Sequence, residues 1–236
     1  MSANRGALQT SIEGQSSGAA NNAYAGCMGA IVEQYLASVS AALQLVDGTE
    51  VSTRWVLPSI LPEYTVGALT AHLGRSITNV ETYLERPAPV DAAPMDAPTY
   101  FATVLADADP VDSDLHRAVR SRSVEVAAAG HSAVVANLRG SAERLHSIDL
   151  AAQPPILVLD GIAMSIDEYL RTRIVELAVH AADLAASVGV EAPALPPDVW
   201  EQVARTVGET AVRRHGAEAY ALSIARPDRT GRLAAF

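Results

Sequence analysis

Apolar residues recur at intervals of three and four along several long stretches of this 236-residue chain. Such spacing gathers the apolar side chains on one face of a helix, and that face has to pack against other elements. The longest predicted helices cover roughly residues 22–46, 65–84, 113–145 and 165–188. Aromatic residues make up only 5% of the chain and alanine is abundant, which favours closely packed helices over a β-sandwich. The sequence therefore predicts a mainly all-α protein.

Polar and glycine residues mark where these helices begin and end. Thr65 is an expected N-cap. Ser165 and Glu168 have the spacing of a capping box, in which each side chain accepts a hydrogen bond from the other residue's backbone N–H. Gly189 is an expected C-cap. The apolar face of the third stretch shifts near Gly130, which predicts a kink or a break there.

Shorter segments complete the predicted organisation. The apolar, β-branched run at 155–160 predicts one extended segment, and further helices are expected at 197–214 and 217–226. A start rich in Gly, Ser, Asn and Gln predicts a flexible leader. The predicted division is a leader, a helical bundle and a C-terminal extension that packs on the bundle: 1–20, 21–190 and 191–236.

Charge and cysteine content exclude several classes of protein. The formal net charge of −10 lacks the basic footprint of a protein that binds nucleic acid or an anionic membrane. The single cysteine, Cys27, permits no intramolecular disulfide and favours the reducing cytoplasm; it is expected to be a packing residue. No uninterrupted apolar run reaches the roughly 18 residues of a membrane span, and no signal peptide is recognised.

Three residues indicate a metal site. Glu176 and His180 are four residues apart on a predicted helix, so their side chains project from one face. His72 lies at the edge of the apolar stripe of another predicted helix and supplies a third candidate ligand. Two histidines and one carboxylate without a fourth protein ligand are typical of a catalytic metal site, because one position stays open for water or substrate.

Further polar groups follow the same helix edges. A row of this kind beside a core face predicts a cleft, with an internal salt-bridge network between Arg173 and Glu176 as the alternative. His131 lies on an apolar face, where a hydrogen-bonded core histidine is the more common outcome and a ligand or proton carrier the other. The remaining candidates for catalysis or substrate binding are Tyr169 and Arg173 on one helix and Ser76, Asn79 and Tyr83 on the other. Asp183 extends the row on the first helix.

Two segments carry a resemblance to a known family: PEYTVGALTAHL (62–73) and RIVELAVHAADL (173–184). They resemble the actinobacterial mycothiol-dependent maleylpyruvate isomerase N-terminal domain family, which belongs to the DinB-like metal-dependent group. The resemblance implies a four-helix, up-down-down-up bundle with a divalent metal held by His72, Glu176 and His180. Zn²⁺ is the expected ion, and Ni²⁺, Fe²⁺ and Mn²⁺ suit the same donors. Tyr64 stands where the family usually has Trp, and the C-terminal extension is shorter than the isomerase's α/β domain.

The resemblance also implies a function. The expected activity is metal-dependent activation of a low-molecular-weight thiol, with mycothiol as a cosubstrate, for addition or transfer to a small electrophile or for its isomerisation. Arg173 would orient a carboxylate or the sugar-bearing thiol, Tyr83 or Tyr169 would donate a proton, and Asp183 would orient a ligand imidazole. A metal-dependent hydrolase and a non-catalytic metal-binding or dimerisation module are the alternatives. The expected partners are small molecules, with neither nucleic acid nor membrane, and the protein is expected to be a monomer or homodimer.

Overall fold

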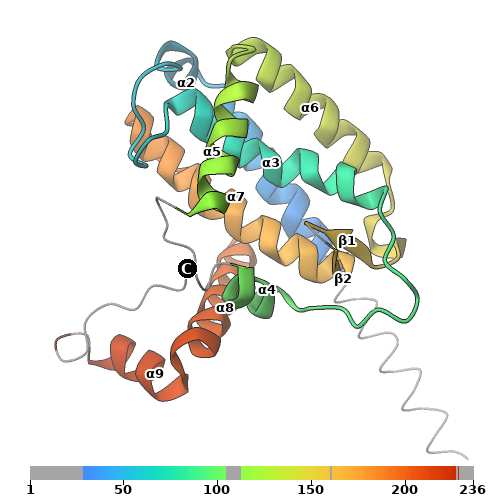
Figure 1. Ribbon diagram of the computed structural model, residues 1–236. Coiled ribbons are helices and arrows are strands. Elements are labelled where there is room, and N and C mark those ends of the chain that lie inside the picture. The colour runs from blue at the N-terminus through green and yellow to red at the C-terminus, as the bar shows by residue number, and fades with distance from the viewer. Residues whose placement is uncertain (1–28, 105–112, 160, 227, 229–236) are drawn as a thin grey trace, which may run out of the picture.

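The computed structural model describes residues 29–104, 113–159, 161–226 and 228. The described chain is mainly helical, as predicted, and its small hairpin lies at one end of the bundle (Figure 1). The N-terminal helix is described from Gly29 to Val46. The other elements are α2 (Thr49–Thr53), α3 (Val66–Leu84), α4 (Ala97–Val104), α5 (Asp114–Ala127), α6 (His131–Ser147), a 3₁₀ turn (Leu150–Ala152), β1 (Ile156–Val158), β2 (Ile162–Met164), α7 (Ile166–Val188), α8 (Pro197–His215) and α9 (Ala217–Ala225).

One hydrophobic core unites the long helices. α3 packs against α5, α6 and α7, so it lies at the centre of the bundle (Figure 1). The core takes apolar side chains from each predicted stripe, including Tyr35, Leu69, Leu145 and Leu170, all of which are essentially inaccessible to solvent. Burial of each such side chain contributes about 1.5–3 kcal/mol, so the matching stripes account for the packing of these helices.

The predicted helix ends are confirmed. The Thr65 side chain accepts a hydrogen bond from the Ala68 backbone N–H at the start of α3. Gly189 ends α7 in the left-handed conformation with φ 73°, which a residue without a Cβ adopts at little cost. The expected break near Gly130 separates α5 from α6, and this glycine has φ 85°.

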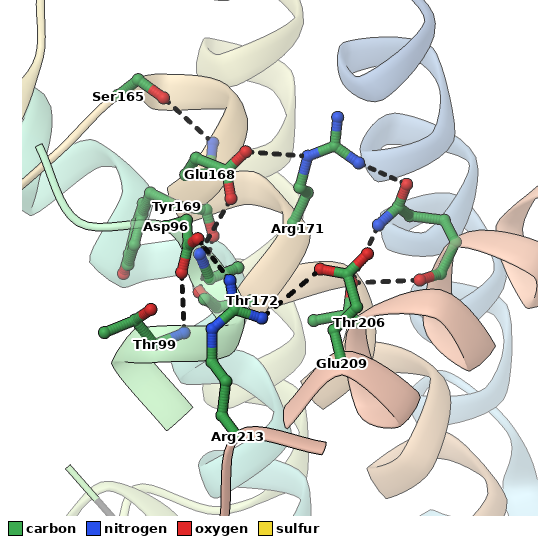
Figure 2. Close-up of polar contacts among 12 residues, drawn as sticks. Asp96, Thr99, Ser165, Glu168, Tyr169, Arg171, Thr172, Thr206, Glu209 and Arg213 are labelled. Atoms are coloured by element: carbon green, nitrogen blue, oxygen red, sulfur yellow. Dashed lines mark hydrogen bonds and ion pairs between the residues drawn. The ribbon is translucent and has the colours of Figure 1, made fainter. Parts of the chain in front are cut away.

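The capping box at the start of α7 is confirmed only in its first half. The Ser165 Oγ accepts from the Glu168 N–H at 3.3 Å. The Glu168 carboxylate was expected to reach back to Ser165, and that expectation is wrong. Its Oε2 instead accepts from the Ala97 N–H at 2.8 Å, and its Oε1 lies 3.3 Å from Nε of Arg171 (Figure 2). Glu168 therefore caps α4, a helix that was not predicted.

Charged side chains link the start of α4 to α8. The Asp96 Oδ1 accepts from the Thr99 N–H at 2.8 Å, which caps the start of α4. The Asp96 Oδ2 accepts from Arg213 of α8 at 2.7 Å, and Arg213 also lies 3.6 Å from Glu209 (Figure 2). These tertiary contacts explain why α4 escaped prediction, since its eight residues are too few to be stable alone.

The extended segment predicted at 155–160 is β1, and it pairs with a second strand that was not predicted. β1 and β2 are antiparallel, with Ile156 opposite Met164. The helices expected at 197–214 and 217–226 are α8 and α9, each within one residue. α8 packs against α7 and α4, and α9 packs against α8.

The N-terminal helix is apolar along its length. Its 18 residues have a mean hydropathy of 1.2, so by length and composition alone it is a candidate membrane span, which the sequence analysis did not expect. The face that carries Tyr35, Val39 and Val46 is fully buried in the bundle core. A buried core helix passes the same test, so this helix is weak support for a membrane span.

Some expectations concern residues outside the described ranges. The leader at 1–20, Cys27 and the start of the first helix are among them, so these expectations stay predictions. The division of the chain at 21–190 and 191–236 also stays a prediction.

Candidate metal centre

The structure brings His72, Glu176 and His180 together where α3 packs against α7. The Nε2 atoms of His72 and His180 are 3.1 Å apart. The His180 Nε2 is also 3.1 Å from Oε2 of Glu176. One donor atom from each of the three residues lies within 4.8 Å of the others. The spacing of Glu176 and His180 along α7, with His72 facing them from α3, therefore places three potential ligand atoms around one point.

The donor set fits a divalent cation. Ligands at about 2.0–2.1 Å from a tetrahedral ion lie about 3.3–3.4 Å from one another, close to the two separations of 3.1 Å found here. The side chains of His180 and Glu176 remain 18% and 25% exposed, so a small molecule can reach them. Three protein donors with solvent access match an open, catalytic arrangement better than a closed structural one.

The far side of the His180 ring is fixed by Asp183. The Nδ1 of His180 lies 3.1 Å from Oδ2 of Asp183, one turn further along α7. An N–H donated to this carboxylate leaves Nε2 free to ligate, which is the orientation that metal-bound histidines usually have. His72 has no equivalent, because its Nδ1 is buried and has no hydrogen-bond partner within the described residues.

The two imidazoles have opposite electrostatic environments. Burial and the neighbouring His180 lower the pKa of His72 to about 4. Burial also disfavours charge on His180, but hydrogen bonds to Asp183 and Glu176 outweigh it and raise the pKa of His180 to about 9. The carboxyl pKa of Glu176 is lowered in spite of burial, chiefly by its hydrogen bond with His180. In the metal-free protein His180 is therefore protonated at neutral pH, and its positive charge stabilises the Glu176 carboxylate.

Arg173 and Tyr169 lie on α7 on the N-terminal side of Glu176. Arg173 is only 8% exposed, its Nε donates to Thr172 Oγ1 at 3.0 Å, and its Cζ lies 5.0 Å from the centre of the Tyr169 ring. Tyr169 is 1% exposed, and its hydroxyl has no hydrogen-bond partner in the described part of the chain. Within the described residues the ion pairs join Glu176 to His180 and not to Arg173, so the alternative of an Arg173–Glu176 salt bridge is not realised.

Three candidates on α3 have different surroundings. The Tyr83 ring meets the Tyr169 ring edge to face at 5.5 Å, so Tyr83 belongs to the same aromatic group. Ser76 is buried, and its backbone carbonyl accepts a hydrogen bond from the Tyr35 hydroxyl at 3.1 Å. Asn79 is half-buried on α3. Substrate contacts of Ser76, Asn79 and Tyr83 stay predictions.

His131 has the contacts of a structural residue. Its Nε2 lies 2.7 Å from the backbone carbonyl of Val46, where the N-terminal helix ends. Its ring packs edge to face against Trp55 at 5.3 Å. The group of potential metal ligands in the described chain does not include it. These contacts favour the hydrogen-bonded core histidine over the ligand or proton carrier.

The structure adds three residues that the sequence analysis did not propose for the site. The Tyr64 ring lies 5.6 Å from the His72 ring. Arg75 follows His72 by three residues on α3, so helical spacing alone would have identified it. Tyr100 is buried on α4, where burial raises the pKa of its hydroxyl and the charge of Arg173 opposes that rise. Tyr100 had no sequence signal, because α4 itself was not predicted.

The described surface includes two hollows that lie apart from the potential ligands. One, of about 430 Å³, is lined by residues 58–65 and includes Tyr64, so it lies on the loop that leads into α3. The other, of about 340 Å³, is polar and lies between α3 and α6 around Glu81 and Arg144. The residues that line them do not include the three potential ligands.

Comparison with known proteins gives one result. A search of curated proteins and a search of solved structures both found no significant match. A family model, the mycothiol maleylpyruvate isomerase N-terminal domain, matches residues 35–185. The matched region contains all three potential ligands and ends before α8. The match spans more than half of the chain, and the chain therefore belongs to the mycothiol maleylpyruvate isomerase N-terminal domain family.

Proposed function

We propose that this protein is a divalent-metal-dependent enzyme that activates a low-molecular-weight thiol of the mycothiol type for reaction with a small electrophile. The observation that carries the proposal is the convergence of His72, Glu176 and His180 within 4.8 Å at a partly exposed site. Membership of a family whose description names mycothiol supports a thiol as the second substrate. A thiol cosubstrate needs a reducing compartment, so the proposed location is the cytoplasm.

Under this proposal the residues of the site would have the following roles. His72, Glu176 and His180 would hold the ion, and Asp183 would keep the His180 ring oriented by its hydrogen bond of 3.1 Å. A bound divalent cation would lower the pKa of a thiol at its open position and so supply a nucleophile at neutral pH. Zn²⁺ is the expected ion, because two imidazoles and a carboxylate suit it, and Ni²⁺, Fe²⁺ and Mn²⁺ are the other candidates.

The test combines metal analysis with a conjugation assay. The purified protein is analysed for bound metal, and the thiol-dependent consumption of a chromogenic aryl halide is followed with mycothiol, before and after chelation. We expect about one equivalent of metal, a rate that depends on both metal and thiol, and loss of both metal and rate in His72→Ala. His146→Gln is the matched control, because His146 is exposed on α6 and bonds the carbonyl of Ala142 in its own helix.

Each outcome discriminates between functions. Turnover of an activated ester that needs metal but no thiol would replace the proposal with a metal-dependent hydrolase. Metal binding without either activity would favour a non-catalytic metal-binding or dimerisation module. A protein that binds no divalent metal, and whose properties are unchanged in His72→Ala, would contradict the proposal altogether.

A further inference from the structure

Two arginines beside the potential ligands have no carboxylate partner. Arg75 follows His72 by three residues on α3, and Arg173 precedes Glu176 by three residues on α7. Neither arginine takes part in an ion pair among the described residues. Arg171, two residues before Arg173, shows the contrast, since it pairs with Glu168 and also donates to Gln202. Among the described residues, each of the two helices that supply the potential ligands thus carries an arginine without an ion pair, three residues from a ligand.

Most of the hydrogen-bonding capacity of Arg173 is unused. A guanidinium has five N–H donors, and in the described structure Arg173 donates one hydrogen bond, from Nε to Thr172. The side chain as a whole is 8% exposed, but none of its nitrogen atoms is both fully buried and without a partner, so the unused N–H groups keep contact with solvent. The Tyr169 ring stacks on the Arg173 guanidinium, but the face of the ring has no oxygen atom that could accept a hydrogen bond. An acceptor that entered beside this guanidinium would find N–H donors that the described protein atoms do not use.

The Tyr169 hydroxyl is a second unused donor in the same place. It is buried and has no partner within the described residues. Burial raises the pKa of Tyr169, so its hydroxyl keeps its proton and remains able to donate. Apart from the Arg173 Nε, which donates to Thr172, Arg173 and Tyr169 therefore carry several N–H and O–H donors for which the described residues supply no acceptor.

The two arginines also oppose each other. Burial, followed by the charges of Arg122 and Arg173 among others, lowers the pKa of Arg75. Like charges brought together in a partly buried place destabilise one another unless an anion lies between them. The Glu176 carboxylate favours the charge of Arg173, but Glu176 already bonds His180. An external anion would relieve the repulsion and use the free donors.

We propose that Arg173, Arg75 and Tyr169 form a subsite for the carboxylate group of a small substrate, next to the metal centre. The planar fork of a guanidinium matches the two oxygens of a carboxylate and binds them in parallel. As a statement about the substrate, the proposal rests on the function proposed above. It narrows that function to electrophiles that carry a carboxylate near the reacting carbon, and it assigns Arg173 to the substrate rather than to the sugar of a thiol.

The test compares an acid with its amide. Binding of propionate and of propionamide is measured by saturation-transfer NMR on the full chain, in metal-free and metal-loaded protein, together with inorganic phosphate. We expect propionate to bind in both forms and propionamide in neither. Arg173→Gln should weaken propionate binding about tenfold or more, because it removes a charged hydrogen-bonding group. Arg171→Gln is the matched control on the same helix and should bind propionate like the wild type.

Two further variants cover the case in which Arg173→Gln does not fold. Arg75→Gln alters a half-buried side chain, and Tyr169→Phe removes only the unpartnered hydroxyl. Both should weaken propionate binding and leave metal content unchanged. Propionate that binds all of these variants as it binds the wild type, or that binds no better than propionamide, would overturn the subsite. Tighter binding of phosphate would overturn the assignment to a carboxylate.

Metal content separates this proposal from the proposed function. Propionate that binds only the metal-loaded protein, with no change in Arg173→Gln, is a ligand of the metal, so the subsite is wrong while the metal centre stands. A protein that binds no metal but binds propionate through Arg173 has the subsite without the proposed function.

Discussion

Asp183 accepts a hydrogen bond from Nδ1 of His180 at 3.1 Å, on the side of the ring opposite to the nitrogen that faces Glu176 and His72. One turn of α7 thus carries both a potential ligand and the group that orients it. The carboxylate also raises the basicity of the imidazole, which strengthens its bond to a cation.

Asp183→Asn should lower metal affinity about 10- to 100-fold without removing the site, because the amide oxygen can still accept the hydrogen bond while the negative charge is lost. Competition with a chromogenic chelator measures the change. Asp149→Asn is the control, since Asp149 caps the 3₁₀ turn and has no contact with the three ligands. Equal affinities in wild type and Asp183→Asn would show that Asp183 does not support the metal.

Metal binding should release one proton and strengthen with pH. The pKa of His180 is raised to about 9 in the metal-free protein, so below that pH an incoming cation must displace the His180 proton. The pKa of His72 is lowered to about 4, so His72 is already neutral and releases none. Between about pH 5 and 9 the metal affinity should therefore rise about tenfold per pH unit.

Calorimetry in two buffers of different ionisation enthalpy counts the released protons. A released proton is taken up by the buffer, so the measured heat shifts by one buffer ionisation enthalpy for each proton. A count of two would mean that both imidazoles are charged in the metal-free protein. A count of zero would mean that His180 is neutral, and either result would contradict the electrostatic description of the site.

The potential ligands could be found from the sequence because each depends on local geometry. Glu176 and His180 are joined by one helical turn, and the edge of an apolar stripe fixes which way His72 faces on α3. Thr65 and Gly189 were predictable for the same reason, since caps act within a few residues. The pairing of α3 with α7 was implied by the family resemblance and not by any local pattern.

The features that escaped prediction depend on contacts between distant segments. Glu168 has the sequence of a capping-box residue, but in the fold the N–H of Ala97 competes for its carboxylate. Because α4 itself was not predicted, Tyr100 on this helix could not be proposed for the site. Arg75 was missed although its spacing from His72 was visible, because a charged residue at a helix edge is usually solvated.

His131→Ala should destabilise the protein and leave its metal content unchanged. The substitution removes the contact with the Val46 carbonyl at 2.7 Å and leaves that carbonyl without this partner, at a cost of about 1–3 kcal/mol. Chemical denaturation and metal analysis measure the two effects. His146→Ala, an exposed histidine on the same helix, should change the free energy of unfolding by less than about 0.5 kcal/mol. Loss of metal in His131→Ala would instead make His131 part of the site.

Gly74 permits the close approach of α3 and α6, and Gly74→Ala should destabilise the fold. A Cβ at this position would lie 2.6 Å from Cδ2 of the buried Leu138, and the packed core leaves that side chain little room to move. The expected loss is about 1–3 kcal/mol, larger than the roughly 1 kcal/mol that alanine gains over glycine within a helix. Because Gly74 lies between His72 and Arg75, displacement of α3 should also weaken metal binding.

Gly140→Ala is the matched control, since Gly140 is also in the middle of a helix. Its Cβ would meet only the end of the Arg144 side chain, at 3.3 Å, and that flexible, largely exposed group can move away. Gly140→Ala should therefore stabilise the protein by up to about 1 kcal/mol. The two melting temperatures should move in opposite directions, by about 2–4 °C for each kcal/mol in a chain of this size. A Gly74→Ala protein that melts no lower than the wild type would show that α3 and α6 do not meet at this glycine.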